Sequence, residues 1–246
     1  LDEKGTSPLM LAVEKSNSKT IRALMTDKDS ADITNKHGDT ALTYAARYNL
    51  RKSMKALLDA GANPNVMSKN RGAALHLAAE NGDANSVSEL IDHGANAELR
   101  NKLGDTPLIL AVRNNHAETV KILLSKGAKP DTTNKDLWTP LMYAASRGNL
   151  PILKLLLAQG AHPDARNRNG WTPLMLASQS GDLIAVSTLL RYGADVNAIS
   201  SDRRSALYIA REYGEKKIAS ALLKAGAEEL PAPVPPGKRE LKGSNS

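Results

Sequence analysis

The five histidines are the side chains in this sequence best suited to metal binding or acid–base catalysis, and they are scattered along the chain. They are His37, His76, His93, His116 and His162. No pair has the His-x-x-x-His or Glu-x-x-His spacing that would place two ligands on one face of a helix. The absence of cysteine excludes thiolate metal sites and cysteine nucleophiles. Because a phosphate-holding Gly-rich loop is also missing, the sequence predicts no catalytic residue, no metal and no cofactor.

A leucine followed three positions later by an alanine recurs every 33 residues, with no insertion or deletion between copies. The leucines are Leu9, Leu42, Leu75, Leu108, Leu141, Leu174 and Leu207. A unit of this length cannot bury its own apolar face, so it is stable only when it stacks on its neighbours. The spacing therefore predicts a repeat architecture, whose function lies in the surface that the stack displays.

Each copy carries signals for two helices and a tight turn. In one copy Gly170 suits the turn, Thr172 can cap a helix and Pro173 suits the first helical position. The same start is weaker at Ala73-Ala74, which lacks a capping side chain. First helices are expected to stop at Asn49, Gly82, Asn115, Gly148, Gly181 and Gly214, and second helices at Gly61, Gly94, Gly127, Gly160, Gly193 and Gly226. The predicted fold class is all-α, a solenoid of helix–turn–helix units with β-turn or hairpin finger loops.

Two helices and an extended turn per 33 residues resemble the ankyrin repeat. The match is to Thr-Pro-Leu-His-x-Ala and to the closing Leu-Leu-x-x-Gly-Ala-Asp, over roughly residues 2 to 228. The resemblance implies that His76 bonds to backbone in its turn, and that the turn tips and the exposed face of the first helix carry partner contacts. We expect one domain, residues 1–228, with repeats at about 2–34, 35–67, 68–100, 101–133, 134–166, 167–199 and 200–228.

Two segments depart from the repeat pattern. The first repeat lacks the closing Gly-Ala, so the loop from Asp27 to Ile33 is expected to be irregular. Residues 229–246 are Pro-rich and then basic, which predicts an extended tail. This tail is either a plain flexible end or a Pro-rich ligand for another domain.

The formal net charge of the chain is +7, of which the tail supplies +2 and the repeats +5. A basic surface favours an acidic partner. Nucleic acid is the rival partner, but no helix has a dense Lys/Arg run and no known nucleic-acid motif is present. No apolar run approaches the roughly 18 residues of a membrane span. We therefore expect a soluble protein. Because the chain begins at Leu1 and not at methionine, we expect that an N-terminal segment has been removed, so the protein is either cytoplasmic or exported, for example periplasmic, with its signal removed, and the compartment is unknown.

Both tryptophans of the chain occupy one position, immediately before the cap of the first helix, in consecutive repeats. That position holds Thr6, Asp39, Gly72, Asp105, Trp138, Trp171 and Arg204, and we take it as the tip of the turn. A large apolar side chain on a tip does not help stacking, and tryptophan is frequent among the residues that dominate protein interfaces. The alternative is that each ring lies back on the neighbouring turn and seals it.

Other displayed positions surround the tryptophans in the repeat register. Leu137 replaces the turn glycine of its repeat, which strains the backbone or forces another turn type, and Arg203 and Arg71 make the same replacement. At Arg71, the adjacent Gly72 can shift the turn by one residue. The predicted partner contacts are Trp138, Trp171, Leu137, Asp136, Leu103, Asp105, Arg100, Arg166, Arg168, Asn169, Arg113, Arg147 and Tyr48.

These observations predict a non-catalytic module, monomeric by itself, that docks a folded protein partner through its concave face and finger tips. If the partner is an enzyme, covering its active site would make the protein an inhibitor or an immunity-type protector. An adaptor or tethering role fits equally. Binding of nucleic acid or an anionic surface through basic residues is the third hypothesis.

Overall fold

The structure is a computed structural model that describes residues 6–25, 31–69 and 71–229. All regular secondary structure in these ranges is helical, apart from isolated β-bridges at Ser68–Gly72 and Ile199–Ser205. The chain forms two compact units, residues 1–162 and 163–246, which we describe separately. The predicted all-α solenoid of helix–turn–helix units is confirmed.

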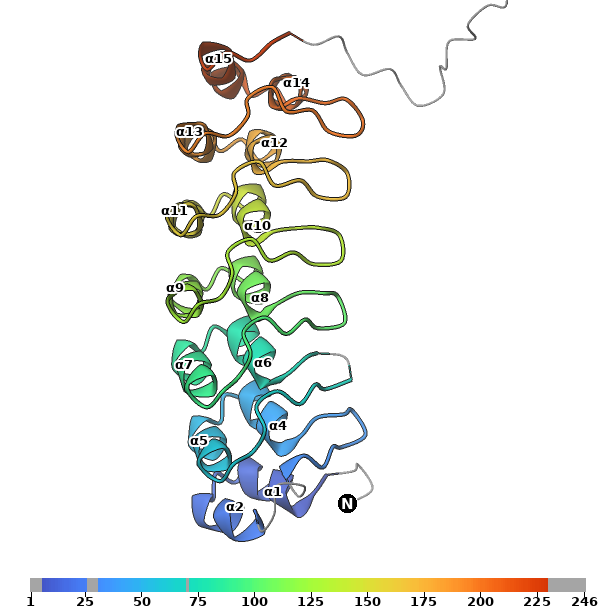
Figure 1. Cartoon of the computed structure of the whole chain (residues 1–246), viewed down its shortest axis with the longest axis vertical. Coiled ribbons are helices and arrows are strands. Elements are labelled where there is room, and N and C mark those ends of the chain that lie inside the picture. The colour runs from blue at the N-terminus through green and yellow to red at the C-terminus, as the bar shows by residue number, and fades with distance from the viewer. Residues whose placement is uncertain (1–5, 26–30, 70, 230–246) are drawn as a thin grey trace, which may run out of the picture. The chain divides into compact units, whose positions relative to one another are not determined.

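The first unit contains five pairs of helices within its described residues. They are α1 (Pro8–Glu14) and α2 (Ser18–Leu24), α4 (Ala41–Arg47) and α5 (Arg51–Asp59), α6 (Ala74–Asn81) and α7 (Ala84–Asp92), α8 (Pro107–Arg113) and α9 (Ala117–Ser125), and α10 (Pro140–Ser146) and α11 (Leu150–Ala158). First helices pack on first helices, as in α4 against α6, and second helices on second helices, as in α7 against α9. Within this unit, the first helices lie between the second helices and the finger loops (Figure 1).

The second unit contains two pairs of helices in its described part. They are α12 (Pro173–Gln179) and α13 (Leu183–Arg191), and α14 (Ala206–Glu212) and α15 (Lys216–Lys224). Here too α12 packs on α14 and α13 on α15, and the finger loops lie on the side of the first helices (Figure 1).

Six of the seven first helices in the described residues begin after a capping side chain. Thr106 Oγ1 accepts a hydrogen bond from the N–H of Ile109, and Thr172 Oγ1 from that of Met175. Ala73 has no such oxygen. Here the N–H of His76, which a capping oxygen would accept, donates to the carbonyl of Ala73. Nδ1 of the His76 ring accepts the N–H of Ala73 at 3.2 Å, and Nε2 of the same ring donates to the carbonyl of Leu99 at 3.0 Å. The implied backbone role of His76 is therefore confirmed.

The helices end at residues with left-handed backbone conformation, as predicted. Every glycine and asparagine expected as a helix stop has a positive φ, for example Asn49 at 55° and Gly94 at 86°. Glycine adopts this conformation without strain, and asparagine tolerates it. The turn at Arg71 is shifted by one residue onto Gly72, whose φ is 98°. The core between the helices consists of Leu, Ala, Ile, Val and Met side chains.

Two predicted segments lie wholly or largely outside the described residues. They are the loop from Asp27 to Ile33, of which 27–30 are not described, and the tail, which is not described after residue 229.

Candidate functional site

Each finger loop is closed at its base by one asparagine side chain. We define the fingers as residues 100–105 and 133–138 in the first unit and 166–171 in the second. Asn101 Oδ1 accepts the N–H groups of Leu103 and Asp105, and the N–H of Asn101 donates to the carbonyl of Asp105. Asn134 and Asn167 repeat this arrangement. The residue before the helix cap is therefore at the base of the finger, and our prediction that it forms the tip is wrong.

Asp105 is the clearest correction to the predicted contacts. Its side chain is 0% exposed, and its Oδ2 lies 2.8 Å from Nη1 of Arg113. Arg113 is partly exposed but is held in this pair. Asp39 and Arg47 form the same ion pair two repeats earlier. We expected Asp105 on the displayed surface. It is instead buried at the base of the finger, where its carboxylate forms an ion pair with Arg113.

Trp138 occupies the register position of Asp105 one repeat later, and it is half-buried. Its ring lies over Tyr143 of α10, with ring centroids 4.9 Å apart at 38°. The hydroxyl of Tyr143 accepts a hydrogen bond from Asn134 Nδ2 at 3.0 Å. Burial of Tyr143, and then the charge of Asp105, raise the pKa of this phenol. Trp138 therefore lies against its own first helix, with part of its ring accessible.

Trp171 lies in the second unit, where it is also half-buried. Its N–H donates to Oδ1 of Asn167, so its backbone closes the finger base as that of Trp138 does. At this repeat position, the backbone N–H of Asp105, Trp138 and Trp171 donates in each case to the asparagine that closes the finger. The position therefore has a structural role in the finger. Whether either ring also contacts a partner stays a prediction.

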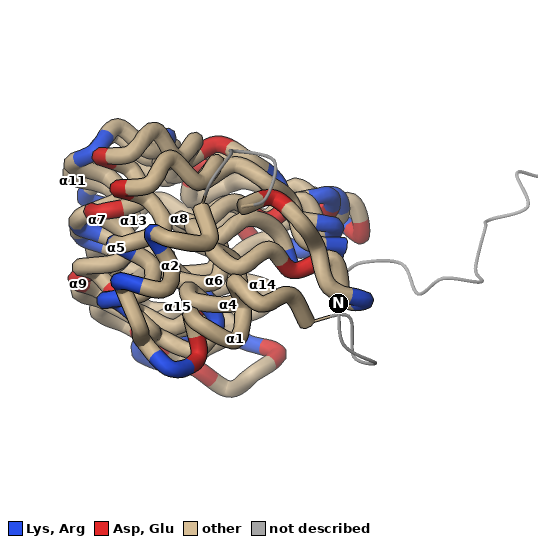
Figure 2. The backbone as a smooth tube through the Cα atoms, turned by 90° about the horizontal axis from the view of Figure 1, so that it is seen from below, with Lys and Arg blue, Asp and Glu red and all other residues tan. Residues whose placement is uncertain are grey.

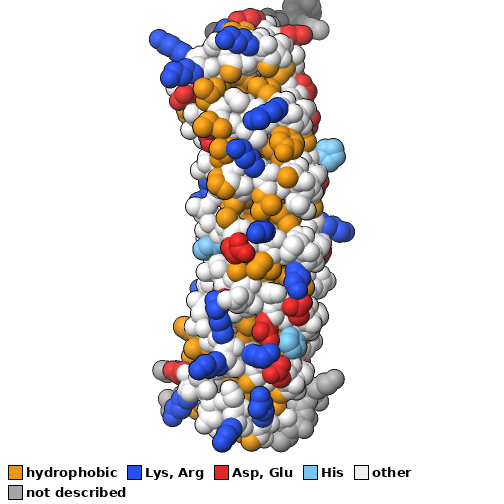
Figure 3. Space-filling model, turned by 90° about the vertical axis from the view of Figure 1, so that its left-hand side faces the viewer, with side chains coloured by type: hydrophobic (Ala, Val, Ile, Leu, Met, Phe, Trp, Pro, Cys, Tyr) orange, Lys and Arg blue, Asp and Glu red, His pale blue; other side chains and the backbone are white. Residues whose placement is uncertain are grey.

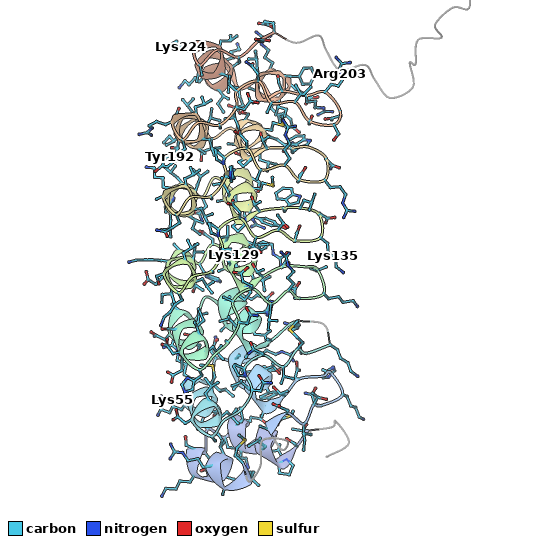
Figure 4. All side chains as sticks on the ribbon, in the orientation of Figure 1. Lys55, Lys129, Lys135, Tyr192, Arg203 and Lys224 are labelled. Atoms are coloured by element: carbon cyan, nitrogen blue, oxygen red, sulfur yellow. The ribbon has the colours of Figure 1, made fainter. Side chains whose placement is uncertain are left out.

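The finger tips of the first unit carry two exposed leucines. Leu103 is 59% exposed and Leu137 is 46% exposed, and the N–H of Lys135 donates to the carbonyl of Leu103 at 3.2 Å, which joins the two fingers. Lys102 and Asp136 are exposed beside them. Lys135 lies on its finger, on the opposite side from Lys55 of α5 (Figure 4). These fingers therefore combine apolar and charged groups on one accessible surface.

Leu137 has a left-handed φ of 61°, at a position where the neighbouring repeats have glycine. Gly38, Gly104 and Gly170 hold the same register position. A leucine in this conformation costs about 1 kcal/mol relative to glycine because its Cβ crowds the following carbonyl. The predicted strain at this tip is confirmed.

Two arginines that were predicted as partner contacts donate hydrogen bonds to the backbone of the next repeat. Arg100 donates to the carbonyl of Thr133, and in the second unit Nη1 of Arg166 donates to the carbonyl of Ile199 at 2.6 Å. Each arginine thus ties one repeat to the backbone of the next. Both remain exposed, so they can also face a partner.

The remaining predicted residues lie on other elements of the two units. Arg168 and Asn169 are exposed on the finger of the second unit. Arg147 follows α10 and lines a pocket of about 420 Å³ together with Asn149. Tyr48 is exposed and lies against Tyr44, with ring centroids 4.7 Å apart, in a different repeat. The structure brings together Arg100, Leu103, Asp136, Leu137 and Trp138, all on adjacent fingers.

The sequence matches a family described as ankyrin repeats (3 copies), with matches over residues 1–68, 52–136, 75–167 and 141–230. Together these cover most of the chain. It belongs to the ankyrin-repeat family. No curated protein matches the sequence. Ankyrin repeats are protein–protein interaction modules and are typically non-catalytic, and no catalytic family is found for this chain. None of its helices within the described residues is long and apolar enough to cross a bilayer.

A cluster on the second helices of this ankyrin chain was not predicted. Asp59, Glu89 and His93 bring three ligand-type atoms within 4.8 Å of one another. Nζ of Lys55 lies in the same cluster, 2.6 Å from Glu89 and 3.6 Å from Asp59. This ammonium supplies the cation that the carboxylates require, so the cluster is an ion-pair network between neighbouring repeats. Sequence spacing missed it because Asp59 comes from a different repeat.

Proposed function

We propose that this ankyrin chain docks a folded protein partner on the finger side of its first unit, around Leu103 and Leu137. The observation that carries the proposal is that two large apolar side chains stand exposed on neighbouring fingers. Scattered exposed leucines are normal on protein surfaces, whereas an adjacent pair rimmed by charged residues is typical of a contact surface. The half-buried ring of Trp138 extends this apolar surface toward α10.

The backbone conformation of Leu137 is a second observation that supports the proposal. A glycine at this position satisfies the turn in three other repeats, yet here a leucine occupies it with a strained backbone. Its side chain stays 46% exposed, so it gains only part of the burial energy of a core leucine. An unfavourable backbone conformation that stacking does not require supports a role in binding.

The charged rim supports an acidic partner surface. Lys102 and Lys135 are exposed beside the two leucines. Such a rim steers an acidic partner and sets its orientation, while the apolar centre supplies affinity. Because the finger backbones are already hydrogen-bonded to one another, docking would order few groups and would lose little entropy.

The role we favour is inhibition of, or protection against, an enzyme whose active site the docked repeats cover. A rigid surface that docks without rearrangement suits this role. Activity of the isolated partner, measured with and without this protein, tests it. Full activity in a saturated complex would instead indicate an adaptor. The exposed residues Arg168 and Asn169 of the second unit are proposed as further contacts, which Ala substitutions would test in the same assay.

Replacing Leu137 with Gly is expected to stabilise the protein while weakening partner binding. The substitution relieves the left-handed strain, so the free energy of unfolding should rise by about 1 kcal/mol. Loss of an exposed apolar anchor should cost about 2 kcal/mol of binding free energy. Urea unfolding measures the first effect, and affinity capture from the native organism followed by titration calorimetry measures the second.

Arg203→Gly is the matched control. Arg203 has a φ of 64° at the same register position, so its replacement relieves the same strain and leaves the leucines in place. It should stabilise the protein and retain the partner. Capture of the same partner at unchanged affinity by Leu137→Gly would refute the proposed docking surface.

A further inference from the structure

A basic residue stands at one finger position in five consecutive repeats. The residues are Lys36, Lys69, Lys102, Lys135 and Arg168, each 33 after the last, and all five are exposed. The first four lie in the unit of residues 1–162, and we call these four the lysine row. Lys and Arg occur on the second helices as well as on the fingers (Figures 2 and 3), so net charge alone does not distinguish the row. Its regular spacing does.

Two of the three steps along the lysine row are set by close approach between finger backbones. A Cβ atom added to Gly38 would lie 2.8 Å from the backbone N of Lys69, and one added to Gly104 would lie 2.8 Å from that of Lys135. Only glycine permits this approach. Because repeats stack at about the distance between packed helices, the charges recur about every 10 Å on a rigid support.

Two of the three carboxylates on the described finger residues of this unit are buried. The carboxylates of Asp39 and Asp105 are buried in ion pairs with arginines of α4 and α8. Asp136 is the one exposed carboxylate among the described residues of the fingers at 34–39, 67–72, 100–105 and 133–138. Arg71 and Arg100 add further positive charge to these fingers. The finger edge of this unit is therefore strongly cationic.

We infer that the lysine row binds an extended acidic peptide segment with a carboxylate at about every third residue. A chain in the extended polyproline II conformation rises about 3.1 Å per residue with three residues per turn, so every third side chain returns to the same face after about 9 Å, close to the distance between successive lysines. Apolar residues between the carboxylates would contact Leu103 and Leu137, which stand 59% and 46% exposed beside the row. The inference deepens the proposed function, since the segment would belong to the docked partner.

The residues beside the row favour peptide over single-stranded nucleic acid. Proteins that bind single strands stack the bases on exposed aromatic rings. The positions that follow Lys36, Lys102 and Lys135 hold His37, Leu103 and Asp136, and the nearest tryptophan ring is half-buried on Tyr143. The row has cations for a polyanion and leucines for apolar side chains, and the one aromatic ring among these three following residues is the imidazole of His37.

The test uses the full chain and a fluorescent peptide of about twelve residues, with Glu at every third position and Pro and Ala between, which favour the polyproline II conformation. A second peptide of the same composition has its glutamates grouped at one end, and a single-stranded oligonucleotide of about the same length is the third probe. Fluorescence anisotropy gives the Kd of each. The row variant is Lys36→Gln, Lys69→Gln, Lys102→Gln and Lys135→Gln combined. The matched control, Lys19→Gln, Lys52→Gln, Lys121→Gln and Lys154→Gln, removes the same charge from exposed sites on second helices.

We expect the spaced peptide to bind the row variant about tenfold more weakly than the wild type, and the control within about twofold. The grouped peptide and the oligonucleotide should bind the wild type more weakly than the spaced peptide. Equal losses in both variants, equal binding of the two peptides, or tighter binding of the oligonucleotide would each overturn the inference. Because no native partner enters this test, its failure would leave the docking result with Leu137→Gly unaffected.

Discussion

Replacing Arg113 with Ser is expected to lower the free energy of unfolding by about 3 kcal/mol. The substitution removes the cation from the fully buried Asp105, whose Oδ1 already has no hydrogen-bond partner within the described chain. An uncompensated buried charge is among the most destabilising changes a core can suffer. We choose the lower end of the range for broken buried pairs because Arg113 is partly exposed, so water can enter the space it leaves. Urea unfolding followed by circular dichroism measures the loss.

The next repeat supplies the matched control. Its residues at the two corresponding positions are Trp138 and Ser146, so the chain itself replaces the ion pair with an aromatic ring and a small polar group. The double variant Asp105→Trp, Arg113→Ser copies this solution. It should recover most of the lost stability, because removing both charges avoids the unpaired carboxylate. A double variant less stable than Arg113→Ser would show that the ion pair is not what closes the finger base.

The helix boundaries were predictable because they depend on backbone conformations that few residues adopt. Gly82 and Asn115 end their helices with left-handed φ, as the pattern predicted, and Thr106 caps α8. These are local effects that a single residue type determines. The repeat period then placed every equivalent residue, which is why the core and the family followed from the sequence.

The depth of the finger base could not be read from the same pattern. The position of a residue in the repeat does not show which residue of a turn lies outermost. In the structure, the N–H of Asp105 donates to Asn101 Oδ1, and this hydrogen bond places Asp105 at the base of the finger. One signal could have revealed the buried pair. Asp39 and Asp105 are each followed eight residues later by arginine, and Arg204 is followed at that distance by Glu212, with the charges reversed. Opposite charges at a fixed separation in three repeats indicate a conserved contact of the fold within this chain.

Acidification is expected to weaken the protein through His76 well before the carboxylates titrate. Burial lowers the pKa of this ring to about 4 from 6.5, outweighing the hydrogen bond to Leu99, which raises it. Nδ1 must stay unprotonated to accept the N–H of Ala73. Above pH 6.5 neither the folded nor the unfolded state binds this proton, so the full stability is present. Below 6.5 the unfolded chain takes up the proton first, and stability falls as the pH falls, until about 4.

The expected loss over this window is about 3 kcal/mol, since each unit of pKa difference corresponds to about 1.4 kcal/mol. Urea unfolding at a series of pH values measures it. Below pH 4 a separate loss follows from Asp83. Burial raises the pKa of this carboxyl, but hydrogen bonds from Arg51 and Ser86 outweigh burial and hold the pKa below its usual 3.8. That contribution is present above the unfolded pKa and disappears as the pH falls through the folded one, so the two windows can be separated.

The variant Ala73→Thr, His76→Ile isolates the histidine because it copies Thr106 and Ile109 of the following repeat, where a hydroxyl caps the helix. It leaves the carbonyl of Leu99 without its donor, which costs about 1 kcal/mol at every pH. The slope of stability against pH between 6.5 and 4 should nevertheless disappear, while the loss below pH 4 remains. If the slope persists in this variant, the acid sensitivity of the stack comes from groups other than His76, and the cap at Ala73 does not depend on its neutral ring.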